Sequence, residues 1–261
     1  MNVNELLTQL AGNQLAGFIL VLARVTPLFI VAPLFSSALI PPRVKGLLAV
    51  GISVGLTPIA MHGQRIPSAT IPIAGLAIVG LLVGLAFAFA LSILLAAIES
   101  AGSLIDVISG FSYGTLINPM NGESSAVISR FYSLVGTMIF LIIGGDAWTI
   151  KGLARSFELV PLTAAPRLSS LVGGVEQVFS TIFTAALEIA APVLAALLIT
   201  DVAFGVVSRV VPQLNVFAVG FPTKVAVALL VAAASLPFIA NWIDGQLTVS
   251  VSAALGALHV S

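Results

Sequence analysis

Long apolar runs follow one another along almost the whole chain. A helix needs roughly 20 apolar residues to cross the hydrocarbon core of a bilayer, which is about 30 Å thick. Each run is continuously apolar, whereas the strands of a membrane β-barrel alternate apolar and polar positions. The pattern predicts an all-α integral membrane protein, a single domain over residues 1–261, with about six long helices. The runs lie at about residues 14–33, 44–61, 70–98, 131–150, 177–200 and 216–243.

Prolines interrupt these runs and predict where the helices bend. A helix from Pro72 to Ile98 would be about 40 Å long at 1.5 Å per residue, so it has to tilt, bend or protrude from the bilayer. Proline removes a backbone donor and clashes with the preceding turn. We therefore expect proline-bent helices arranged as hairpins. The breaks are expected near Pro33, Pro58, Pro119, Pro161 and Pro192.

Composition excludes the soluble classes of protein. Of the 261 residues, 59% are hydrophobic and only 8% are charged, against about 25% charged in an ordinary soluble domain. Ten basic and ten acidic residues cancel, so there is no basic surface for nucleic acid. The chain has no cysteine and only two histidines, too few for a histidine metal centre. A soluble enzyme, a disordered chain and a nucleic-acid binder are excluded, and no cofactor is expected.

Charged residues within or beside the apolar runs are the first candidates for function. A charge at the centre of a spanning helix costs about 2.5–3.5 kcal/mol to insert, so it faces protein or water rather than lipid. One interpretation is an ion or proton path. The other, which the scatter of these residues favours, is a structural ion pair between helices or subunits, or a side chain at a helix end that reaches water. We expect Arg24 and Arg209 to be neutralised by carboxylates or helix-end carbonyls, inside the protein or at a subunit interface. The candidates are Arg24, Asp146, Glu188, Asp201, Arg209 and Lys224.

A polar, glycine-rich stretch from Glu99 to Arg130 is predicted to connect two helices. Glu99 and Asp106 are seven residues apart and would share one helix face, where a solvated helix end is the favoured interpretation. Residues 110–114 match the G-x-S-x-G pattern of a hydrolase nucleophile elbow. The surrounding sequence has no strand–helix alternation, so a flexible loop is favoured over catalysis.

Two pairs of glycines have the spacing of close helix contacts. Gly51 with Gly55, and Gly80 with Gly84, are each separated by three residues. Small residues at this spacing let helix backbones approach closely. The two pairs favour tight packing within the chain or between subunits.

The most specific string runs from Ser208 to Lys224 and reads SRVVPQLNVFAVGFPTK. It resembles the signature of the FliR family of flagellar biosynthesis proteins, which belong to the type III export gate. Shorter pieces of resemblance, from Arg24 onward, cover almost the full chain in the expected order. Asp146 departs from the family, which often has histidine there. The signature residues are Pro212, Gln213, Asn215, Gly220, Phe221 and Pro222.

The resemblance implies a non-catalytic core subunit of a multi-subunit helical gate. FliP-like and FliQ-like subunits would complete its closed pore, with FlhB-like and FlhA-like components as further partners. The cargo would be unfolded flagellar proteins, and the site would be the flagellar basal body in the bacterial inner membrane. The injectisome homologues are related, but the sequence from Pro212 to Pro222 favours the flagellar branch.

The resemblance also implies a pore plug, a loop that maps by position and composition onto residues 110–122. Glycine lets such a loop fold tightly and move, and bulky side chains would block small solutes. The glycines are Gly110, Gly114 and Gly122, and the bulky residues are Phe111, Tyr113, Leu116, Ile117 and Met120.

A small polytopic transporter is the alternative interpretation. Helices broken at prolines are how transporters build sites at the midplane of the membrane. Its solute or ion site would lie near Glu188, Pro192 and Asp201. A gate subunit should co-purify with FliP-like and FliQ-like chains, whereas a transporter should be self-sufficient and bind solute.

Overall fold

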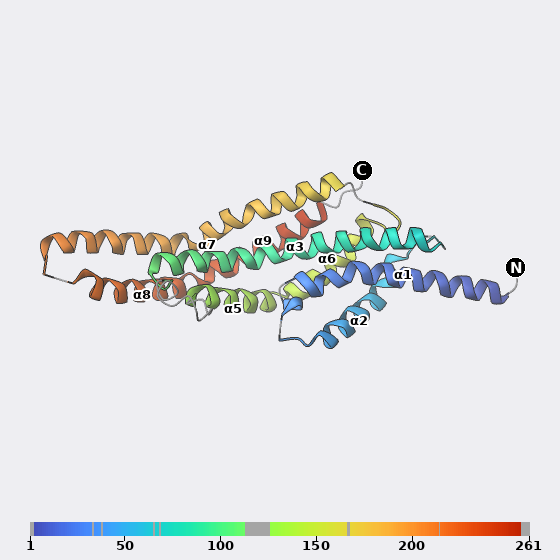
Figure 1. Ribbon diagram of the computed structural model, residues 1–261, viewed down its shortest axis with the longest axis horizontal. Helices are drawn as coiled ribbons and strands as arrows, with labels where there is room; N and C mark the ends of the chain where they lie inside the picture. The colour runs from blue at the N-terminus through green and yellow to red at the C-terminus, as the bar shows by residue number, and fades with distance from the viewer. Residues whose placement is uncertain are drawn as a thin grey trace. The chain divides into compact units, whose positions relative to one another are not determined.

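The computed structural model describes residues 3–32, 34–37, 39–64, 66–67, 69–112, 126–165, 168–213 and 215–256. Across these residues it contains helices and no strands (Figure 1). Five helices are long and apolar enough to cross a membrane, and α5 with α6 would add a sixth as one broken span. The prediction of an all-α integral membrane protein is confirmed. The α-helices are α1 (Val3–Val31), α2 (Pro42–Ala60), α3 (Thr70–Ser109), α5 (Val127–Ile142), α6 (Gly145–Leu159), α7 (Leu168–Val210), α8 (Val216–Ala234) and α9 (Leu236–Gly256), and a 3-10 helix covers Leu34–Ser36.

Helix α3 is longer than its apolar run predicted. It continues past Ile98 to Ser109, so its 40 residues extend about 60 Å at 1.5 Å per residue. The continuation keeps a buried stripe with helical spacing, formed by Ala101, Gly102, Ile105, Asp106 and Ser109. The prediction of a connection beginning at Glu99 was therefore wrong for its first eleven residues, because polar composition hid the periodicity.

The prolines end fewer helices than expected. α6 ends at Leu159, just before Pro161, as predicted. α2 passes through Pro58 and ends two residues later. The break expected at Pro192 is wrong, because α7 continues through this residue to Val210. Its neighbours Ile189, Ala190 and Val193 are fully buried, so packing holds the helix where one ladder hydrogen bond is lost. Pro33 and Pro119 lie outside the described residues.

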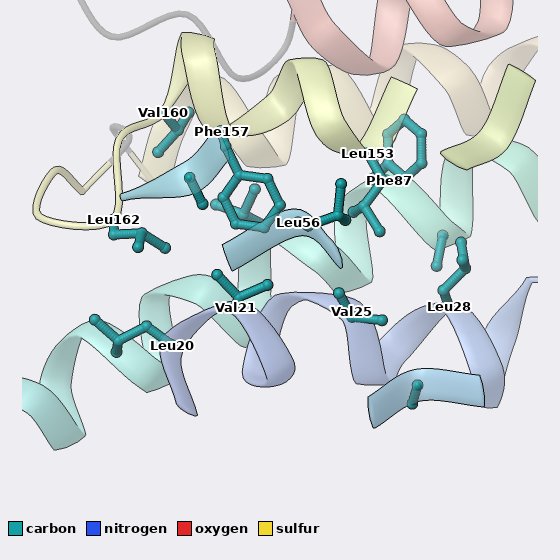
Figure 2. Packing of buried hydrophobic residues seen from close by; sticks show 14 of the residues in the cluster. Leu20, Val21, Val25, Leu28, Leu56, Phe87, Leu153, Phe157, Val160 and Leu162 are labelled. Atoms are coloured by element: carbon teal, nitrogen blue, oxygen red, sulfur yellow. The ribbon is translucent and has the colours of Figure 1, made fainter. Parts of the chain in front are cut away.

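Contacts along the chain define two compact units. Unit 1 comprises residues 1–93, 144–179 and 247–261, and unit 2 comprises residues 94–143 and 180–246. Helices α3, α7 and α9 contribute residues to both units. Unit 1 holds an apolar core from α1, α2, α3 and α6 (Figure 2). The residues labelled in that view are Leu20, Val21, Val25, Leu28, Leu56, Phe87, Leu153, Phe157, Val160 and Leu162.

Glycines bring α3 against α1 inside unit 1. A Cβ at Gly84 would collide with the backbone carbonyl of Arg24, and one at Gly80 would lie 3.4 Å from the carbonyl oxygen of Leu20. The close packing predicted for this pair is confirmed. Among the described residues, Gly51 and Gly55 on α2 have no atoms within 4 Å of an added Cβ, so the close packing predicted for this pair does not occur within the described chain.

Replacing Gly84 with alanine should destabilise unit 1. The new methyl group has no room against the α1 backbone, and overpacking of this kind costs about 1–3 kcal/mol. Gly75 is the matched control on the same helix, because an added Cβ there has no atoms within 4 Å. Gly75→Ala should be neutral or stabilise by about 0.5–1 kcal/mol. Thermal unfolding of the detergent-solubilised protein measures both effects, and equal stability of the two variants would contradict the packing argument.

Candidate functional site

Asp106, near the end of α3, caps the start of α5. Asp106 is 2% exposed, and its carboxylate accepts hydrogen bonds from the backbone N–H groups of Ile128 at 2.9 Å and Ser129 at 2.8 Å. The N-cap residue of α5 is Ala126, which makes no side-chain cap. Asp106 thus supplies from another helix the cap that a first turn needs. Its negative charge also complements the positive end of the helix dipole.

The backbones of α3 and α5 approach closely beside this carboxylate. A Cβ at Gly102 would lie 2.5 Å from the Cα of Ser129. The Ser129 hydroxyl donates to the carbonyl of Glu99 at 3.2 Å and accepts from the hydroxyl of Ser103 at 3.1 Å. We call Gly102, Asp106 and Ser129 the α3–α5 clamp. It joins the two ends of the segment 113–125, which itself lies outside the described residues.

The solvated helix end predicted for Asp106 is therefore wrong, although Glu99 is exposed. Asp106 lies on the buried stripe of α3, and two backbone donors satisfy its charge there. One signal in the sequence points to this arrangement, because the carboxylate shares the helical spacing of small and apolar residues on α3. That Ala126 is the N-cap of α5 and cannot cap it is seen only in the structure.

The predicted plug is described only at its start. Gly110 has a φ of 94°, a conformation that glycine adopts without strain. The turn after α3 closes with the N–H of Ser112 donating to the carbonyl of Asp106 at 3.3 Å. A helix rather than a strand precedes Gly110, so the described part lacks the geometry of a nucleophile elbow. Phe111 is described, whereas Tyr113, Gly114, Leu116, Ile117, Met120 and Gly122 lie outside the described residues.

Arg24 on α1 is 1% exposed and lies at the C-terminal end of α6. Its Nη1 donates to the carbonyl of Ser156 at 3.1 Å and to that of Val160 at 2.8 Å. The guanidinium carbon lies 4.5 Å from the ring centre of Phe157, a cation–π distance. Among the described residues, its Nε finds no hydrogen-bond partner. Arg24 is thus held by helix-end carbonyls, one of the two kinds of partner expected for it.

The family signature forms the end of α7, a turn and the first half of α8, and the second half of α7 lies beside α8 (Figure 1). Asp201 on α7 pairs with Lys224 on α8. The Asn215 side chain caps α8 by accepting from the N–H of Ala218 at 3.1 Å. Gly220 is buried, and its Cβ position lies 3.8 Å from the ring of Phe204. The exposed members of the signature are Pro212, Gln213, Asn215, Phe221 and Pro222.

Arg209 and Asp146 lie in terminal turns of their helices. Arg209 is exposed in the last turn of α7, where a cation complements the negative end of the helix dipole. Asp146 is in the first turn of α6, where an anion is favourable and a protonated histidine would be unfavourable. Within the described residues, no three His, Asp or Glu side chains converge to hold a metal ion.

Glu188 on α7 faces an open groove in unit 2. The groove has a volume of about 490 Å³. The indole Nε1 of Trp242 donates to the Glu188 carboxylate at 3.4 Å. The hydroxyl of Ser235 contacts that of the buried Tyr132 at 3.2 Å, which fixes one wall against α5. The lining residues are Glu188, Ala191, Pro192, Val231, Ala234, Ser235 and Phe238.

Removing the Asp106 carboxylate should loosen the first turn of α5. Loss of a cap costs about 0.5–2 kcal/mol, so Asp106→Ala should speed hydrogen exchange at the amides of Ile128 and Ser129 about tenfold. Asp106→Asn keeps one acceptor oxygen and should give an intermediate rate. Glu99→Ala is the control, because Glu99 is exposed on the same helix. Unchanged exchange in Asp106→Ala would show that the clamp does not hold this turn.

Comparisons with known proteins agree with the resemblance seen in the sequence. Residues 15–249 match the family described as Bacterial export proteins, family 1. The chain is 31% identical over 223 residues to flagellar biosynthetic protein FliR of Escherichia coli (strain K12), covering 85% of each chain. It is 31% identical over 220 residues to FliR of Bacillus subtilis (strain 168), covering 82% of this chain and 83% of that protein.

The similarity extends to a second group of proteins. Surface presentation of antigens protein SpaR of Shigella flexneri is 27% identical over 209 residues, or 80% of each chain. The family match spans both compact units and the signature at the α7–α8 turn. The resemblance to FliR is confirmed. The chain therefore belongs to family 1 of the bacterial export proteins and is a membrane-embedded component of a type III export apparatus.

Proposed function

We propose that the chain is a non-catalytic core subunit of the flagellar type III protein export gate in the bacterial inner membrane. With FliP-like and FliQ-like subunits it forms the closed pore through which unfolded flagellar proteins are exported, and FlhB-like and FlhA-like components adjoin it. The observation that carries the proposal is the family match over residues 15–249, together with 31% identity to a flagellar FliR over 85% of the chain.

The exposed surface of the signature hairpin supports a role in assembly. Val206, Val210 and Phe217 are more than half exposed around the α7–α8 turn, and the charged Arg209 is exposed among them. A charge within an apolar helix surface is costly against lipid. Neighbouring protein subunits can cover apolar side chains and also supply partners for such a charge.

The α3–α5 clamp supports a plug formed by residues 110–122. Irregular backbone is excluded from lipid but tolerated where protein surrounds it or it lines a pore. A plug must stay in one place while its own backbone yields to a passing chain. The clamp meets the first requirement, because Asp106 and Gly102 fix both ends of the segment between α3 and α5.

The residues named for a transporter site do not come together in the described structure. Glu188 and Pro192 line the groove, whereas Asp201 pairs with Lys224 between α7 and α8. A carboxylate that already has a cationic partner is a poor candidate for an ion or solute ligand. The gate subunit is therefore the function that the site supports best.

Arg209→Ala should reduce assembly with the other gate subunits, because an exposed cation at the end of α7 is available to a partner. The measurement is the yield of FliP-like and FliQ-like chains that co-purify with the tagged protein after co-expression. Arg43→Ala is the control, since Arg43 is also exposed near a helix end but lies outside the signature. Equal yields for the wild type and Arg209→Ala would count against a role for Arg209.

Deleting residues 111–120 should leave assembly intact and make the membrane permeable to ions or small solutes, because the bulky side chains of the proposed plug are lost. A conductance or small-solute permeability assay on cells tests this. A variant that keeps the length but replaces the five bulky residues with serine separates bulk from length. If both assembled complexes stay sealed, the barrier lies in another subunit.

A further inference from the structure

The groove at Glu188 combines an acidic group with apolar walls. Glu188 is exposed although it lies nine residues into the apolar segment Phe179–Val210. Its one described partner is the neutral indole of Trp242, which leaves the negative charge uncompensated. A carboxylate this far inside a spanning helix would cost about 2.5–3.5 kcal/mol against lipid. A positively charged occupant would neutralise this carboxylate and remove that cost.

Pro192 weakens the helix beside Glu188. In an α-helix the carbonyl of residue 188 would accept from the N–H of residue 192, but proline has no N–H. The acceptor that the groove presents is the Glu188 carboxylate, which suits an ammonium or guanidinium group, because each of these donates several hydrogen bonds.

Unit 2 does not provide this cation among its described residues. Its basic residues are Arg130, Arg209 and Lys224. Lys224 is paired with Asp201, and no contact joins any of the three to Glu188. The remaining lining residues are small or apolar, and Ala191 and Ala234 allow a helix backbone to come close.

We propose that this groove receives a lysine or arginine side chain carried by an apolar helix of a neighbouring gate subunit. The inference rests on the proposed gate function and identifies the surface and chemistry of one contact. The partner's cation pairs with the carboxylate of Glu188, while its apolar neighbours pack on Pro192, Val231 and Phe238.

Charge reversal tests the pairing. With FliP-like and FliQ-like subunits co-expressed, Glu188→Lys should lower the yield of the complex at least tenfold, since it places two like charges in the groove. Glu188→Gln should cause a smaller loss. Glu176→Lys is the matched control, because Glu176 is exposed on the same helix but precedes the apolar segment. Membrane levels of each variant expressed alone show that the chain itself is produced.

Cross-linking identifies the occupant. A photoreactive residue in place of Ala191 or Phe238 should link to a single apolar helix of another subunit. Changing a lysine or arginine of that helix to glutamate should then restore assembly of Glu188→Lys. The proposal is overturned if the photoreactive residue cross-links to lipid. It is also overturned if no change of a lysine or arginine to glutamate in the partner helix restores assembly of Glu188→Lys. Full assembly of Glu188→Lys also overturns the proposal. If that variant assembles fully but no longer takes up a small cation, the groove binds a free cation and not a side chain of a partner subunit.

Co-purification of the wild-type chain with the other subunits shows whether a negative result refutes the groove contact or the gate function. If wild type co-purifies with the other subunits and Glu188→Lys does so equally, the groove contact is refuted and the gate function stands. If wild type does not co-purify with them, the gate function itself is refuted.

Discussion

Helix ends in apolar surroundings lack water, and satisfying their backbone groups is the constraint on which this structure depends. Arg24 donates to the last carbonyls of α6, and Asp106 accepts from the first N–H groups of α5. The cation lies at a helix C-terminus and the anion at an N-terminus, so both match the helix dipole. Each charge thereby compensates unpaired backbone groups, and the backbone groups compensate the charge.

Glycines of α3 lie beside both of these contacts. Gly102 lies against Ser129 in unit 2, and this close approach of α3 and α5 lets the short Asp106 side chain reach the first turn of α5. In unit 1, Gly84 lies against the backbone of Arg24 and so packs α3 on the helix that carries Arg24, whereas the helix end that Arg24 contacts belongs to α6.

The sequence predicted four helices well because a bilayer demands long apolar runs, and four of the six runs fall on α1, α2, α3 and α7. The other two runs each joined two helices, because the run 131–150 crosses the break between α5 and α6 and the run 216–243 crosses the break between α8 and α9. Prediction from the sequence failed where the deciding interaction is not local. Asp106 looked solvated because its partners, Ile128 and Ser129, are more than 20 residues away. Pro192 looked like a break because the burial of its neighbours in α7 depends on tertiary packing. The signature at the α7–α8 turn revealed the family but not the Asp201–Lys224 pair.

Several charged residues of the described chain differ in which groups compensate their charge. Arg24 and Asp106 are satisfied by helix ends, and Asp201 by Lys224. Glu188 and Arg209 remain exposed on the unit 2 part of the apolar helix α7. Each such charge disfavours a solitary chain in lipid by about 2.5–3.5 kcal/mol at the bilayer centre, and less toward the interface, where it can reach water. Contacts that supply the missing partners recover part of that free energy, so the stability of this chain is coupled to its assembly.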